Sequence, residues 1–169
     1  MSFVIRAARD SDLQHLYDLA KLTGGGFTNL PPDRGALRAK LDRSSAAFAR
    51  DTDGGLADEL FVLVLENIAT GDVRGTCQIF THVGQSHPFY SYRLSTLTQH
   101  SQQLNRTFRA EMLALTTDLE GCSEVGGLFL HPAEPLAIFA LTETIFLVEP
   151  FPRSRGSSPA LLGRLLRDH

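Results

Sequence analysis

The stretch SEVGGLFLHPAEPLAIFA, residues 123–140, decides how the fold of this chain is interpreted. Its first half contains the apolar run LFL (128–130), which is typical of a β-strand, and the run stops at Pro132. Gly126 and Gly127 lie inside the strand, where glycine often marks a β-bulge or the close approach of another backbone or a ligand. Two interpretations stay open: an edge strand that pairs with an extended ligand, or an ordinary core strand with a bulge.

The bulk composition indicates one globular domain. The chain has 169 residues, of which 43% are hydrophobic and 21% are charged, and its net charge is −3, so no basic face argues for nucleic acid or an anionic membrane. The opening MSFVIRAARDSD lacks the pattern of a signal peptide, and no apolar run reaches the length of a bilayer, so we expect a cytoplasmic protein. Cys77 and Cys122 are expected to be reduced, structural thiols.

The hydrophobic pattern predicts an α/β chain, with a mixed α+β sheet flanked by helices. A helix over 11–22 is indicated by apolar residues at helical spacing and by a Ser11–Gln14 capping box. The run LFVLVLENI (60–68) is typical of a strand covered on both faces, and it forms a hairpin with 73–83. The remaining expected elements are a strand at 3–5, a helix from 31, a strand at 88–99, a segment at 106–118 that fits helix or strand, and a strand at 123–132.

Few side chains suggest a particular chemistry by their spacing. The histidines match no metal-ligand motif, so no metal site is predicted; they are His82, His87, His100 and His131. Tyr90, Tyr92 and Arg93 either line a pocket for a polar substrate or belong to a strand with one wet face. Glu124 is either a functional carboxylate or a solvated residue where the strand begins.

Five stretches, in this order along the chain, resemble the N-terminal half of arginine N-succinyltransferase, a family of the GNAT acyltransferase superfamily. They are VIRAARDSDL (4–13), AKLTGGGFTNLP (20–31), LFVLVLENIATGDVRGTCQI (60–79), PFYSYRLSTLTQHSQQL (88–104) and LTTDLEGCSEVGGLFLHP (115–132). The resemblance implies a GNAT-like region over 1–132 and a divergent segment of the same domain over 133–169.

The resemblance also implies a reaction. Enzymes of this family transfer a succinyl group from succinyl-CoA to the α-amino group of arginine, and sometimes of ornithine, in arginine catabolism. In the superfamily the fourth strand lies beside the pantetheine arm, which places the backbone of Leu128, Phe129 and Leu130 at the acyl donor. A carboxylate with fork geometry, from Glu124 or Asp118, would suit the substrate guanidinium. The resemblance names no catalytic base here.

The chain departs from the family after Pro132. The following AEPLAIFALTETIFLV lacks the arginine and glycines that wrap the CoA pyrophosphate in the family. Arg153, Arg155 and Gly156 are a second candidate for this cradle, and a polar turn before a C-terminal helix is the alternative. Three hypotheses therefore stand: an arginine succinyltransferase, a catalytically inactive relative that acts through protein–protein interaction, and a generic GNAT acetyltransferase that uses Arg153–Ser158. An exposed apolar surface, covered in a homo-oligomer or by another subunit, is also expected.

Overall fold

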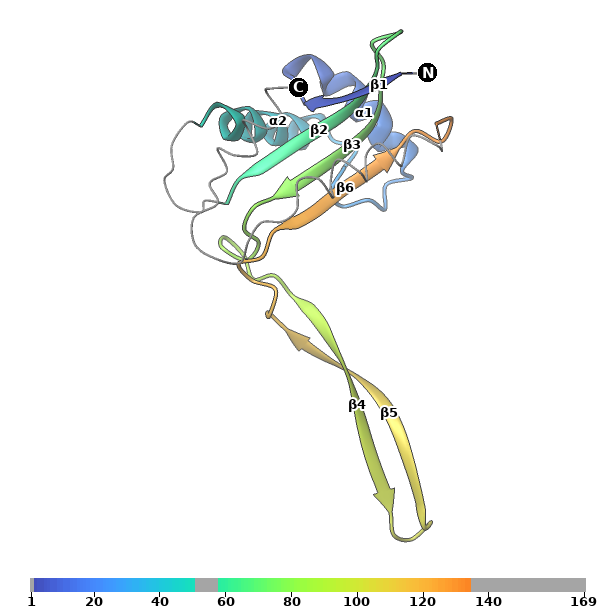
Figure 1. Cartoon of the computed structure of the whole chain (residues 1–169). Helices are drawn as coiled ribbons and strands as arrows, with labels where there is room; N and C mark the ends of the chain where they lie inside the picture. The colour runs from blue at the N-terminus through green and yellow to red at the C-terminus, as the bar shows by residue number, and fades with distance from the viewer. Residues whose placement is uncertain (1, 51–57, 135–169) are drawn as a thin grey trace. The chain divides into compact units, whose positions relative to one another are not determined.

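The computed structural model describes residues 2–50 and 58–134, which contain two helices, one short 3-10 helix and six strands (Figure 1). They cluster into two compact units, one formed by residues up to Thr81 together with those from Ser123, the other by His82–Cys122. The sequence did not distinguish these units. The elements are β1 (Phe3–Ala7), η1 (Asp10–Asp12), α1 (Leu13–Leu22), α2 (Arg34–Ala49), β2 (Leu60–Asn67), β3 (Val73–Phe80), β4 (Ser91–Ser101), β5 (Arg106–Thr116) and β6 (Glu124–Leu130).

The first unit is an antiparallel sheet with strand order β1-β2-β3-β6, and helices α1 and α2 lie on one of its faces (Figure 1). Strand β2 lies inside this sheet and is buried along almost its whole length. Its alternate residues Leu60, Val62 and Val64 pack with the helices, whereas Phe61, Leu63 and Leu65 belong to the cluster on the opposite face. The prediction of a strand covered on both faces, paired in a hairpin with the next strand, is confirmed.

Both predicted helices are present, but they begin later than predicted, at Leu13 instead of residue 11 and at Arg34 instead of residue 31. The capping box at Ser11–Gln14 is wrong: η1 occupies residues 10–12, and α1 begins after Asp12 without a side-chain cap. Gln14 instead donates to Asp18 at 2.8 Å, because both lie on one exposed side of the helix. Helix α2 begins after Asp33, whose carboxylate accepts a hydrogen bond from the Ala36 N–H at 2.6 Å. Among the described residues no helix is long and apolar enough to cross a bilayer.

The second unit is a two-stranded ribbon of β4 and β5, in register from Ser91↔Thr116 to Ser101↔Arg106. The segment whose pattern fitted helix or strand is therefore a strand. Of the two alternatives for Tyr90, Tyr92 and Arg93, the strand with a single wet face is wrong, because both faces of the ribbon are exposed. Leu94 and Leu113 are register partners and remain 62% and 67% exposed. An isolated two-stranded ribbon buries little of either face, which explains this exposure.

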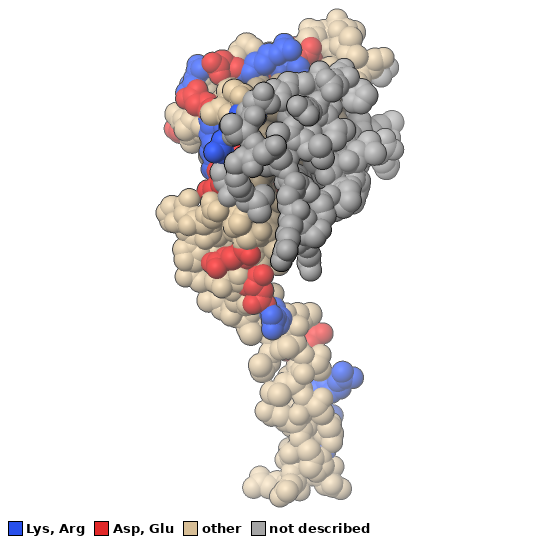
Figure 2. Space-filling model, turned by 60° about the vertical axis from the view of Figure 1, so that its left-hand side comes forward, with Lys and Arg blue, Asp and Glu red and all other residues tan. Residues whose placement is uncertain are grey.

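Figure 2 shows the molecule from one side, and most of the ribbon surface visible in that view is uncharged. The charged residues of its two strands are Arg93, Arg106, Arg109 and Glu111. Large apolar side chains are exposed on both faces of the ribbon, among them Tyr92, Leu94, Phe108, Met112 and Leu115. The sequence predicted an exposed apolar surface at AIFALTETIFLV (137–148), which lies outside the described residues, so the apolar surface of the ribbon is a separate finding.

The thiol of Cys77 is expected to be inert in the folded protein. Cys77 is 1% exposed in the core, and burial raises the pKa of its thiol to about 12. Because the thiolate is the nucleophile, only about one molecule in ten thousand is reactive near pH 8. We expect iodoacetamide to modify Cys77 only after unfolding in urea, as measured by peptide mass spectrometry. Rapid modification of the folded protein at this position would contradict the buried environment.

Candidate functional site

Strand β6 is the last strand of its sheet. It pairs with β3 on one flank, and no strand within residues 2–50 or 58–134 pairs with the other. The N–H of His131 donates to the carbonyl of Arg74 at 2.7 Å, on the β3 side. Backbone groups of successive residues in an antiparallel strand point to opposite flanks, so the N–H and C=O of Leu130 point toward the open one. As far as residues 2–50 and 58–134 show, this flank has backbone groups free to pair with an extended ligand by strand addition.

Strand β6 has a β-bulge at Gly127 and Leu128, directly after the paired Gly126. Thr76 pairs with Phe129 and Gln78 with Gly126, so two residues of β6 lie opposite the single residue between them on β3. Gly127 has φ 59°, a left-handed conformation that L side chains rarely adopt. The prediction that a glycine marks a bulge here is confirmed, and the same strand is an edge strand as far as the described residues extend.

The space above both glycines contains side chains of the chain itself. A Cβ atom at Gly127 would lie 2.6 Å from Nε2 of Gln78, and one at Gly126 would lie 2.6 Å from Nδ2 of Asn29. Glu124 also approaches, with its Oε1 at 3.3 Å from the same Gly126 position. A side chain at Gly127 would displace the hydrogen-bonded Gln78, whereas the groups above Gly126 are the ends of flexible side chains.

These side chains belong to a polar group that we call the bulge cluster: Asn29, Lys40, Gln78 and Glu124. The Lys40 ammonium donates to Oε1 of Gln78 at 2.8 Å, and Nε2 of Gln78 donates to the carbonyl of Asn29 at 2.7 Å. Lys40 Nζ also lies 5.4 Å from the centre of the Phe80 ring. The cluster joins the loop before α2, helix α2, β3 and β6 within the first unit.

The electrostatics of the bulge cluster centre on Lys40. Burial lowers the pKa of its ammonium, the neighbouring Arg43 lowers it further, and Glu124 acts in the opposite direction. The cation is thus half removed from water while a carboxylate lies in the same region. Such a pair of opposite charges beside an open backbone edge suits a small zwitterionic or anionic ligand.

The structure divides the residues that the sequence singled out between the two units. Leu128, Phe129 and Leu130 lie on β6, and Glu124 is its first residue, so these four are together. Leu128 and Leu130 pack on the face of Phe61, whereas Phe129 packs on the helix side. Tyr90, Tyr92 and Arg93 belong to the second unit, where Arg93 is ion-paired with Asp118. Arg153, Arg155 and Gly156 lie outside the described residues.

Sequence reasoning missed Asn29, Lys40 and Gln78. A usable signal was present, because Gln78 interrupts the apolar end of a strand, VRGTCQIF, and is nevertheless only 1% exposed. A buried glutamine requires hydrogen-bond partners for both of its polar atoms. Those partners lie 38 and 49 residues away in the chain, which no local pattern reveals.

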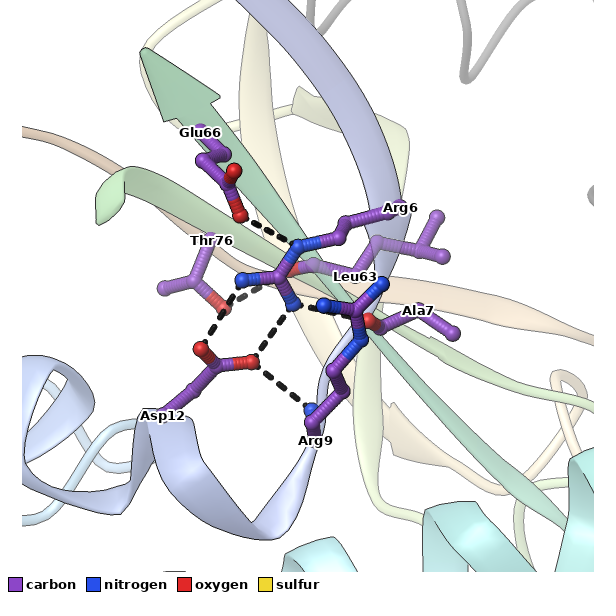
Figure 3. Close-up of polar contacts among 7 residues, drawn as sticks. All are labelled: Arg6, Ala7, Arg9, Asp12, Leu63, Glu66 and Thr76. Carbon is purple, nitrogen blue, oxygen red and sulfur yellow. Dashed lines mark hydrogen bonds and ion pairs between the residues drawn. The ribbon is translucent and has the colours of Figure 1, made fainter. Parts of the chain in front are cut away.

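A second polar network holds the start of the chain and accounts for the stretch VIRAARDSDL (Figure 3). Arg6 donates to both carboxylate oxygens of Asp12, at 2.6 and 2.9 Å, and its Nε donates to Glu66 at 2.5 Å. Asp12 also accepts from the N–H of Arg9 at 2.7 Å. Burial would raise the pKa of Asp12, but these hydrogen bonds hold it below its ordinary value. The network ties β1 and β2 to η1 and is structural.

An antiparallel sheet with helices on one face and a bulged edge strand defines a mixed α+β fold, and a solved succinyltransferase subunit shares it. The structure of arginine/ornithine succinyltransferase subunit AI from Pseudomonas aeruginosa is similar with a TM-score of 0.72 and 32% identity, over 82% of this chain and 42% of that one. The family described as "Arginine N-succinyltransferase beta subunit" matches residues 3–138. The chain belongs to the arginine N-succinyltransferase family.

Curated relatives agree with this assignment. The arginine N-succinyltransferases of Salmonella paratyphi B and Salmonella newport are each 38% identical over 129 residues, which is 76% of this chain. The same alignments cover 37% of each relative, so the chain spans well under half the length of the curated relatives that it matches.

Proposed function

We propose that the protein is an acyltransferase of the GNAT type that moves the succinyl group of succinyl-CoA to the α-amino group of arginine. Membership of the arginine N-succinyltransferase family supports the reaction. The observation that carries the proposal to particular residues is the open flank of β6 next to its glycine bulge. A pantetheine arm carries amide groups that can pair with an open strand edge.

The proposed reaction is an acyl transfer without a covalent enzyme intermediate. The neutral α-amine attacks the thioester carbonyl carbon, a C–N bond forms, the C–S bond breaks, and the CoA thiolate leaves. A base takes a proton from the amine, and the thiolate takes up a proton from the solvent or from that base. Of the backbone of Leu128, Phe129 and Leu130, the N–H groups that point to the open flank, such as that of Leu130, would stabilise the oxyanion. We assign no residue as the base.

The acceptor would lie beside the bulge cluster. Glu124 is the carboxylate that we propose for the substrate guanidinium, because Asp118 is already ion-paired with Arg93. Tyr90, Tyr92 and Arg93 of the second unit stay separate, sequence-based proposals for contacts to a polar substrate.

Two further parts of the assignment are proposals of the same kind. Arg153, Arg155 and Gly156 are proposed for the CoA pyrophosphate. A cytoplasmic location and assembly into a homo-oligomer, or with a second subunit, complete the assignment, and size-exclusion chromatography with light scattering tests the assembly. An eluted monomer that binds no hydrophobic dye would oppose it.

Titration calorimetry and a thiol-release assay test the proposed reaction together. We expect binding heat with CoA, with succinyl-CoA and with S-succinylpantetheine, which carries the arm without the nucleotide. We expect release of free CoA when arginine is added, with ornithine and lysine as comparison acceptors. Binding without turnover would favour the inactive relative that acts through protein contacts, and the absence of any binding heat would remove the acyltransferase proposal.

A proline at Leu130 tests the open flank of β6 directly. Leu130→Pro removes the N–H that points away from β3, and proline is tolerated on edge strands. Leu130→Ala is the matched control, because it loses the same side-chain packing and keeps the N–H. One lost hydrogen bond is worth about 1 kcal/mol, so we expect S-succinylpantetheine to bind about fivefold more weakly to Leu130→Pro than to Leu130→Ala. Equal affinities would place the arm elsewhere.

A further inference from the structure

We propose that Lys40 is the carboxylate-binding residue of this site, and that its ammonium group receives a free carboxylate of an acyl-transfer substrate. The inference rests on the proposed function for the identity of the substrates, but not for the presence of the anion site. The shared chemistry is an aliphatic carboxylate. Two sources present one: the far end of the succinyl group, and the α-carboxylate of the amino-acid acceptor.

The first support is that Lys40 forms no direct ion pair with any carboxylate of the described residues, although Glu124 lies in the same region. An ammonium group has three N–H donors, and Lys40 uses one of them for Gln78. No carboxylate of the described residues lies within ion-pair distance of Lys40. Seven other cation–carboxylate pairs do form there, and each of them uses arginine. A half-buried cation with free donors is costly unless an anion binds it.

The second support is that the Lys40 ammonium is held in place. Its hydrogen-bond partner Gln78 is 1% exposed and is itself held by the carbonyl of Asn29. Helix α2 is anchored on either side of Lys40, since Leu37 and Leu41 are 1% and 0% exposed. A charge that is positioned before the ligand arrives loses little freedom on binding. This arrangement is that of a binding group rather than of a solvated surface lysine.

The third support is the location of Lys40 within the cluster. Its partner Gln78 also packs over Gly127 in the bulge of the strand that carries the open flank. Glu124 acts on the charge of Lys40 and has its carboxylate over Gly126. A ligand with a carboxylate and a cationic group therefore meets one complementary charge for each. Both charges lie on the first unit, so the site needs nothing from the ribbon.

The chain offers a matched control for Lys40. Lys21 and Lys40 are its two lysines. Lys21 is on the exposed side of α1, with its Nζ at 4.2 Å from the centre of the Tyr17 ring. Selective labelling with 13C,15N-lysine thus gives two side-chain signals, one for the proposed anion site and one for an exposed reference. Lys40→Met and Lys21→Met assign them, and Met keeps the length and apolar character of the stem.

The deciding experiment follows the lysine side-chain signals by NMR while ligands are added to the full chain. The probes are succinate, arginine and agmatine, which is arginine without its carboxylate. We expect saturable shifts of the Lys40 signal with succinate or arginine, no such shift with agmatine, and no saturable shift at Lys21. A Lys40 signal that ignores both carboxylates, or moves only in parallel with Lys21, would overturn the proposal. This readout needs no turnover, so it remains decisive if the proposed reaction fails.

Steady-state kinetics then identify the source of the carboxylate. Loss of a charged hydrogen bond lowers kcat/KM by about tenfold to a hundredfold. If Lys40 binds the donor, Lys40→Met loses this factor with succinyl-CoA but not with butyryl-CoA, which has the same carbon chain without the carboxylate. If it binds the acceptor, the loss appears with arginine but not with agmatine. An equal loss with every substrate, or no loss relative to Lys21→Met, would count against carboxylate binding. Urea unfolding of both variants checks that each is folded.

Discussion

Arg6→Met is expected to lower the free energy of unfolding by about 3–5 kcal/mol, because it breaks a buried ion pair by removing one partner. Asp12 is 3% exposed and would keep only the Arg9 N–H, and Glu66 would lose its bond to the same guanidinium. Methionine preserves most of the apolar stem, so the loss reports the charged contacts. Urea unfolding followed by circular dichroism measures it. The free energy of unfolding of a domain is typically about 5–15 kcal/mol in total. We therefore expect the variant to be close to unfolding at moderate temperature.

The matched control is Arg38→Met. Arg38 lies 3.7 Å from Asp10, and the two side chains are 47% and 66% exposed. Exposed pairs contribute about 0–1 kcal/mol, so the same substitution should here be nearly neutral. Similar losses in the two variants would show that the network of Arg6 contributes no more than a surface pair.

Acid should weaken the native fold through the same network. The folded-state pKa of Asp12 lies below its ordinary value of 3.8, so its ionised form is stabilised by folding. The resulting contribution is complete above that value and is lost as the pH falls through the lower folded-state pKa. In Arg6→Met, burial still raises the pKa of Asp12, but the guanidinium no longer lowers it. The loss of stability that Asp12 causes at low pH should therefore disappear. If the free energy of unfolding of Arg6→Met falls with decreasing pH as steeply as that of the original protein, Asp12 is not the source of the acid dependence.

Gly127→Ala is expected to destabilise the fold by about 2–5 kcal/mol, from left-handed backbone strain and overpacking together. The backbone has φ 59°, and the new Cβ would lie 2.6 Å from Nε2 and 2.8 Å from Cδ of Gln78. Gln78 cannot move freely, because its amide bonds to both Lys40 and the carbonyl of Asn29. The measurement is again the urea midpoint, with lysine NMR to report displacement of the Lys40 signal.

Gly71→Ala separates the two contributions. Gly71 has φ 74° in the turn between β2 and β3, and a Cβ there would meet nothing within 4 Å. The control therefore incurs only the backbone strain, about 1–2 kcal/mol. If Gly127→Ala costs no more than Gly71→Ala, the bulge has room for a side chain, and the packing described for Gln78 is not a constraint.

Much of the first unit could be predicted from local sequence. The continuous apolar run of β2 indicated burial on both faces, and the turn after it indicated the hairpin, because these signals depend on residues next to one another. The double glycine indicated the bulge for the same reason. The family resemblance extended these expectations to a reaction and to the backbone of Leu128–Leu130.

The bulge cluster and the ribbon could not be predicted in this way. Lys40 meets Gln78 only because α2 packs over β2, the strand that pairs with β3, and no local pattern near either residue indicates that contact. The alternation of apolar and polar side chains along β4 would be the same in a broad sheet and in a ribbon of two strands. Whether such a strand has two neighbours or one depends on the rest of the fold, so the full exposure of Leu94 and Leu113 was not foreseen.

The connection between β3 and β6 has an evolutionary consequence. The hydroxyl of Ser123 donates to the carbonyl of Thr81 at 3.0 Å, so the chain returns to the point from which it left the sheet. The two ends of the segment between these residues therefore lie side by side, and a change in the length of such a segment is compatible with the strands that flank it. We therefore expect a gene in which a tight turn replaces residues 82–122 still to encode the four-stranded sheet.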